Sequence, residues 1–133
     1  MRRIALVLAA GAALLSAPAL QARDKLSGEE RLAKILDGRE AGKPVDCIPL
    51  TASRETRVID KTAIVYDAGS VIYVNRPSNA KSLDDDDIMV TEPHGSQLCR
   101  LDVVRMHDRS GFWYNGFVGL EQFVPYRKVA IRD

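Results

Sequence analysis

The pattern of hydrophobic and polar positions along the chain begins with a helical period. Apolar residues recur at the spacing of one helix face at Leu32, Ile35 and Leu36. A capping box precedes them, because the Ser27 hydroxyl can accept from the Glu30 amide while the Glu30 carboxylate reaches back to the Ser27 amide. Gly38 is the expected end of the helix. The stretch 23–44 is therefore predicted to hold one amphipathic helix, followed by a polar connector over 39–44.

From residue 45 to residue 133 the pattern is that of a β domain. Short runs rich in β-branched and aromatic residues alternate with turn segments that contain Gly, Pro, Asn, Asp or Ser. The runs predicted as strands are 45–50, 58–59, 62–66, 71–74, 88–90, 97–106 and 112–126. No helical pattern lies between them, so neighbouring strands should be antiparallel. We predict a mainly β fold, a small antiparallel barrel or sandwich of about six short strands with the N-terminal helix packed across it.

Residues 1–22 have the pattern of a cleavable signal peptide rather than of a folded element. Arg2 and Arg3 supply positive charge, an apolar run follows over 4–15, and small residues at 16–22 supply a cleavage zone. The apolar run of about 12 residues is shorter than the roughly 20 that a membrane-spanning helix needs. The alternative is an uncleaved N-terminal anchor. We expect an exported protein, periplasmic or secreted, with no transmembrane segment in the mature chain.

The charge composition adds one conclusion to this picture, which concerns nucleic-acid binding. The chain has 19 Lys and Arg against 18 Asp and Glu, and removal of the leader leaves 17 basic against 18 acidic residues. Such a balance excludes a nucleic-acid binder that depends on bulk electrostatic attraction. The length that remains is typical of one soluble domain with a single core.

The expected export bears on the oxidation state of the two cysteines, Cys47 and Cys99. An oxidising compartment and an even count favour one structural disulfide between them. Two free buried thiols or a redox-active pair are the alternatives, although the spacing is not C-x-x-C. On strand alternation, the cysteines share their face with Val45, Leu101 and Val103, which are apolar enough to form the inner face.

The most conspicuous polar segment is the acidic run Asp84–Asp87. A calcium loop of the EF-hand type needs Gly at its sixth position and Glu at its twelfth. Counted from Asp84, those positions hold Met89 and Gly95, so the template fails. A solvated acidic loop is the main interpretation, and cation binding by Asp84 and Asp86 is the alternative.

His94 and His107 are the remaining candidate metal ligands. Neither belongs to an H-x-x-x-H or H-E-x-x-H arrangement, and a zinc site needs three or four ligands. Ser96 lacks the G-x-S-x-G context of a nucleophilic serine. We therefore expect no catalytic residue and no cofactor. The alternative is a small hydrolase or metal-dependent enzyme that uses both histidines and the Asp84–Asp87 loop.

Aromatic residues are concentrated near the C-terminus. Six of the eight follow residue 111, namely Phe112, Trp113, Tyr114, Phe117, Phe123 and Tyr126. Our main interpretation is the core and edge of the last hairpin. The alternative is a patch, formed by Arg105, Trp113 and Tyr114, that binds a partner or a small ligand.

Several stretches resemble a family of small exported proteobacterial proteins of unknown function. They are GKPVDCIPL at 42–50, RVID at 57–60, AIVY at 63–66, YVN at 73–75 and QLC at 97–99, within a resemblance that covers roughly 27–126. The resemblance implies export and pairing of the two cysteines, and it transfers no catalytic residue. We thus expect a small exported globular protein, a non-enzymatic envelope protein or a ligand- or partner-binding module.

Overall fold

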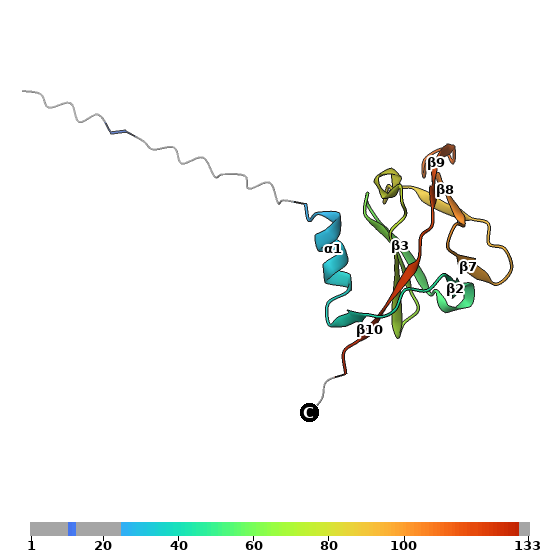
Figure 1. Ribbon diagram of the computed structural model, residues 1–133. Helices are drawn as coiled ribbons and strands as arrows, with labels where there is room; N and C mark the ends of the chain where they lie inside the picture. Colours follow the sequence, from blue (N-terminus) through green and yellow to red (C-terminus); the bar gives the residue numbers. More distant parts are fainter. Residues whose placement is uncertain (1–10, 13–24, 131–133) are drawn as a thin grey trace, which may run out of the picture.

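The computed structural model describes residues 11–12 and 25–130 (Figure 1). Apart from Gly11 and Ala12, the predicted signal peptide lies outside the described residues and stays a prediction.

The predicted helix is present as α1 (Gly28–Ile35). Its capping box is confirmed, because the Ser27 hydroxyl accepts from the Glu30 amide and the Glu30 carboxylate accepts from the Ser27 amide, each at 3.2 Å. The helix ends before Gly38, whose φ of +73° lets the chain turn into the first strand. The helix therefore begins and ends close to where local signals place it.

Five strands form the largest sheet, in the order β1-β10-β5-β4-β3. They are β1 (Arg39–Ala41), β3 (Glu55–Ile59), β4 (Ala63–Asp67), β5 (Val71–Asn75) and β10 (Phe123–Lys128). The prediction of a connector over 39–44 is wrong for its first three residues, because they form β1, which pairs with β10. Its first residue, Arg39, is held by bonds from the guanidinium to the carbonyls of Gly69, Ser70 and Tyr126, so polar contacts rather than an apolar pattern fix this edge strand.

Two smaller sheets complete the β domain. One pairs β2 (Cys47–Pro49) with β7 (Gln97–Cys99), and the other has the order β6-β8-β9, with β6 (Ile88–Thr91), β8 (Val103–His107) and β9 (Tyr114–Gly119). Two short 3₁₀ helices, η1 (Leu50–Ala52) and η2 (Ala80–Ser82), lie in the connections. All strand pairs are antiparallel, as predicted.

The mainly β prediction is confirmed, with more and shorter strands than expected. The run 97–106 divides into β7 and β8 at a turn where Leu101 has a φ of +74°. The run 112–126 divides into β9 and β10, and the buried Asn75 side chain bonds both backbone groups of Glu121 in the turn between them. The sheets do not close into a barrel, and their layered arrangement is sandwich-like.

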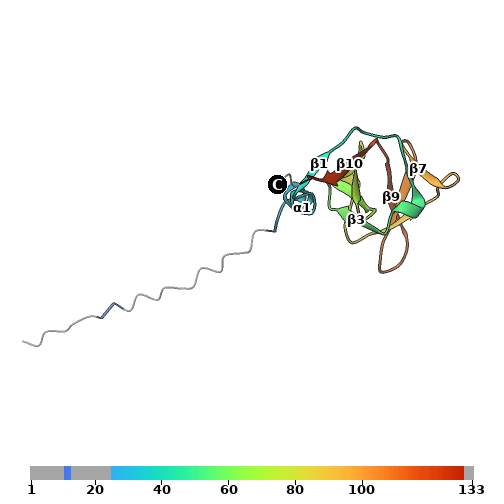
Figure 2. The same ribbon diagram turned by 90° about the horizontal axis from the view of Figure 1, so that it is seen from below.

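The elements form three layers, with α1 on one side of the five-stranded sheet and the two smaller sheets on the other (Figures 1 and 2). Strand β4 lies between β5 and the edge strand β3 and is buried on both faces. Ala63 and Val65 pack in the cluster under α1 with Leu32. Ile64 and Tyr66 point the other way, into the main core. That core is formed by Ile48, Ile64, Tyr66, Leu83, Leu98, Val104, Met106, Val118, Leu120 and Phe123.

The predicted disulfide is confirmed. Cys47 and Cys99 are directly opposite each other in the β2–β7 pair, with Cα atoms 4.0 Å apart. The predicted inner face is wrong, because Ile48 and Leu98 point into the core while the cysteines are half-buried on the other face. Strand β7 ends at Cys99, so the alternation that we extended to Leu101 and beyond stops at the turn.

Asn79, just before η2, contacts the outer edge of β9. Its side-chain amide donates to the Phe117 carbonyl at 2.8 Å, and its side-chain oxygen accepts from the Gly119 amide at 3.2 Å. The side chain thus occupies two backbone groups of this edge strand.

Candidate functional site

The outer face of the β8–β9 pair carries Arg105 and Tyr114, two of the three residues that the sequence offered as a binding patch, and Trp113 lies in the loop just before β9. Register places Arg105 opposite Phe117 and His107 opposite Tyr114, so these four side chains share one face. The adjacent pair, Val104 with Val118, and Met106 between Arg105 and His107 are fully buried in the core. The four therefore point away from the core.

The interpretation of the C-terminal aromatics as core is wrong for most of them. Each of Phe112, Trp113, Tyr114 and Phe117 is more than half exposed, whereas Phe123 is buried. Strand alternation explains the exposure of Phe117, because its neighbour Val118, the one buried residue of β9, faces the core and Phe117 points the other way. We call the exposed set Val103, Phe112, Trp113, Tyr114 and Phe117 the aromatic face.

The loop at the end of this face is held by Asp108. One carboxylate oxygen accepts from the Ser110 amide at 2.8 Å, from the Gly111 amide at 3.1 Å and from the Ser110 hydroxyl. These hydrogen bonds, from the hydroxyl first, lower the pKa of Asp108. The Asp108 carbonyl accepts from Phe112, and its amide donates to the Trp113 carbonyl, at 2.8 and 2.9 Å. The loop is therefore closed by its own bonds.

The aromatic rings are positioned by their neighbours. Phe112 has a φ of +57°, and its ring stacks on His107 with centroids 4.6 Å apart. Tyr114 meets the same imidazole edge-on at 6.0 Å. The Trp113 ring lies over Gly111, where an added Cβ would come within 1.8 Å of a ring carbon. A side chain at residue 111 would displace the indole, so the glycine is part of this arrangement.

An ion pair, Arg105 with Glu92, lies at the margin of this face. The Arg105 guanidinium contacts the Glu92 carboxylate at 3.1 Å, and both side chains are about half exposed or more. The pair lies beside the aromatic face rather than under it, since Arg105 is opposite Phe117. Both charges thus stay accessible at its margin.

The acidic run is tied to the chain by several contacts. Asp84 accepts from the Asp86 amide at 2.9 Å, and Asp85 pairs with an arginine, Arg31, at 3.0 Å. Asp87 is buried, and both its carboxylate oxygens accept from Asn115. The carboxylates of Asp60, Asp84 and Asp85 lie within 4.8 Å of one another, in a largely exposed group. Asp86 is not part of this group, and cation binding by Asp84 and Asp86 stays the untested alternative to a solvated loop.

The two histidines are not brought together. His107 is opposite Ile88 at the start of β6, whereas His94 lies three residues beyond Thr91, at the other end of that strand. His94 is almost fully exposed, and its nearest carboxylate is Asp102 at 3.8 Å. The enzyme alternative required both histidines beside the acidic loop, and only the His107 end of the sheet lies near it.

Sequence reasoning missed Asp108 and Gly111. The run Arg-Ser-Gly at 109–111 indicates a turn, and an Asp two residues before Ser and three before Gly is the available signal for a side-chain bond to their amides. Nothing local indicated which aromatic rings would be exposed.

No helix among the described residues is long and apolar enough to cross a membrane. No protein-family model matches the chain, and comparison with curated proteins and with solved structures gives no match either.

Proposed function

We propose that this protein is an exported, non-enzymatic module of the periplasm or cell exterior that binds another protein through the aromatic face. The observation that carries the proposal is the exposure of four aromatic side chains on one sheet and its adjoining loop. Folded monomers rarely expose contiguous large apolar patches unless the patch binds something.

The residue types on this face match those that contribute most to protein interfaces. Aromatic residues and arginine are enriched among interface residues whose removal costs the most affinity. Here Trp113, Tyr114 and Arg105 supply these types. The Asp108 bonds fix the loop before binding, which lowers the entropy lost on association.

A protein fits this face better than a sugar or a nucleic acid. Sugars and bases stack on flat rings, whereas the exposed Val103 and the neighbouring Leu101 add aliphatic surface that such ligands do not use. The near-neutral charge of the chain gives no attraction to phosphates. The expected partner presents an apolar patch with an acidic group to meet Arg105 and a basic group to meet Glu92.

Export is supported by two independent features. Residues 1–22 have the composition of a signal peptide, and the chain carries an intramolecular disulfide, a bond that persists in oxidising compartments.

The test begins with crosslinking of the envelope fraction of cells that express the protein, followed by identification of the crosslinked protein by mass spectrometry. The identified protein is then purified and titrated calorimetrically against three chains: wild type, W113S/F117S and V129S. Val129 is a comparably exposed apolar residue outside the aromatic face and serves as the matched control.

We expect W113S/F117S to weaken binding at least tenfold and V129S to leave it unchanged. Equal affinity for all three chains would overturn the proposal. So would light scattering that shows wild type to be a dimer and W113S/F117S a monomer, because a second copy would then cover the face.

A further inference from the structure

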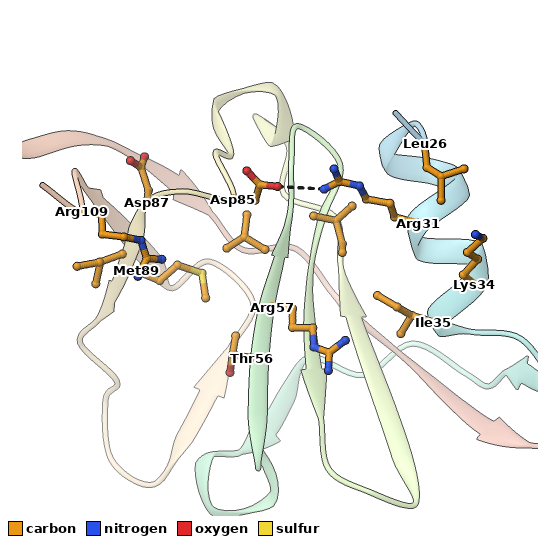
Figure 3. Close-up of a pocket in the computed structure, with 13 residues that line it drawn as sticks. Leu26, Arg31, Lys34, Ile35, Thr56, Arg57, Asp85, Asp87, Met89 and Arg109 are labelled. Carbon is orange, nitrogen blue, oxygen red and sulfur yellow. Dashed lines mark hydrogen bonds and ion pairs between the residues drawn. The ribbon is translucent and has the colours of Figure 1, made fainter. Parts of the chain in front are cut away.

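The five-stranded sheet and the β6-β8-β9 sheet leave a seam between them. Among the described residues, β3 pairs only with β4 and β6 pairs only with β8, so each ends its sheet. A groove of about 670 Å³ lies along this seam and under α1. In Figure 3 the side chains of Thr56 and Met89 lie between the two edge strands, and Arg57 points to the α1 side of β3.

A second cavity, of about 290 Å³, adjoins the groove and shares Thr56 and Met89 with it. Its other walls come from the main core: Ile48, Leu50, Tyr66 and Leu98, with Ser53 and Thr91 beside them. No charged side chain of the described residues lines it. It is near the lower limit of the size of known ligand pockets and is mostly apolar, as such pockets are.

One residue that lines this cavity, Tyr66, carries a polar group that the described part of the fold leaves without a partner. Tyr66 is 5 % exposed, and its buried hydroxyl has no hydrogen-bond partner among the described residues. Burial raises the pKa of the phenol, so the group is a neutral donor at physiological pH. The Tyr66 ring packs edge-on against Phe123 at 5.7 Å, a contact that phenylalanine would make equally well. Burying an unpaired hydroxyl costs free energy that phenylalanine would avoid.

We propose that this cavity binds a small, neutral, largely apolar molecule whose carbonyl oxygen accepts a hydrogen bond from the Tyr66 hydroxyl. The apolar walls match a hydrocarbon body, and the lack of charged lining residues favours a ketone, ester or lactone over an acid or amine. The groove between β3 and β6 gives the ligand a path from solvent. This site is separate from the aromatic face, which lies on the outer side of β8 and β9.

The test uses the full mature chain and four probes: 2-heptanone, methyl pentanoate, δ-octalactone and, as a hydrocarbon without oxygen, toluene. Binding is followed by amide chemical shifts of Thr56, Met89 and Leu98 in NMR titrations. Y66F is the matched variant, because it removes only the hydroxyl and should fold at least as stably as wild type. M89W is the second variant and places a bulky ring where the groove and the cavity meet.

We expect the carbonyl probes to shift all three amides in wild type and to bind Y66F roughly twofold to tenfold more weakly. Toluene should bind wild type and Y66F equally, and M89W should block every probe. The proposal is overturned if the carbonyl probes shift none of these amides at their solubility limit. It is also overturned if Y66F retains wild-type affinity for them, and this result holds even if M89W fails to fold.

Discussion

Replacing both bridged cysteines by alanine, in C47A/C99A, should cost about 4 kcal/mol in the free energy of unfolding. The bridge joins residues separated by 52 positions, and the chain-entropy model gives roughly that free energy for closing a loop of this length in the unfolded chain. The double variant is preferable to either single one, because it leaves no free thiol to form bridges between chains.

In the folded state the bridge lies directly beside the core. Strands β2 and β7 pair over only three residues each, and the neighbours of the cysteines, Ile48 and Leu98, are each 2 % exposed. Once the bridge is gone, so short a sheet has little else to hold those two side chains in place. For a domain of about 100 residues, 4 kcal/mol corresponds to a fall in Tm of roughly 15–30 °C.

Urea unfolding followed by far-UV circular dichroism measures the effect, with thiol titration to confirm that the wild-type bridge is intact. Q97A is the matched control, because Gln97 is exposed on the same strand and its substitution keeps the bridge. We expect Q97A to stay within about 0.5 kcal/mol of wild type. If C47A/C99A unfolds within 1 kcal/mol of the oxidised wild type, the loop-closure reasoning is refuted.

Three further predictions concern polar side chains. N75A should lower stability by about 2–3 kcal/mol in urea unfolding, because the buried Asn75 amide pairs both backbone groups of Glu121, and a loss under 0.5 kcal/mol would contradict this. Millimolar calcium should leave Tm unchanged if the acidic loop is only solvated, and a rise of several degrees that is lost in Asp84→Asn would show a cation site. The Asp108 pKa lies below its usual 3.8, so its loop is stabilised above about pH 4 and loses this support as pH falls through the folded pKa. Carboxyl NMR titration of Ser110→Ala should show that pKa returning toward 3.8, and an unchanged value would refute the assignment.

Features with a local or chemical cause could be predicted from the sequence. The helix follows from the Ser27–Glu30 capping box, and the disulfide was predicted from cysteine parity and the expected export. The main strand runs were visible as β-branched and aromatic stretches. Strand β1 was missed because its pairing with β10 depends on Arg39 contacts with distant carbonyls.

Features that depend on which surfaces become covered could not be predicted. Alternation shows that Phe117 and Val118 point to opposite faces of β9, yet it does not tell which face meets the core. The turn at Leu101 was hidden because a leucine with positive φ carries no glycine signal. The Tyr66 cavity is lined by residues of several strands, among them the edge strands β3 and β6, and no single run of the sequence shows which strands end their sheets.

The contact of Asn79 with β9 has a consequence for the solution behaviour of this chain. An edge strand with free backbone groups can template the addition of further strands, the route by which apolar β segments form aggregates and fibrils. Here β9 combines an edge position with an exposed Phe117, a combination that would favour such growth. The Asn79 side chain has the donor and acceptor of a peptide group and occupies the Phe117 carbonyl and the Gly119 amide. One asparagine thus blocks strand addition along the Phe117–Gly119 end of this edge, while the aromatic side chains of the same strand remain exposed.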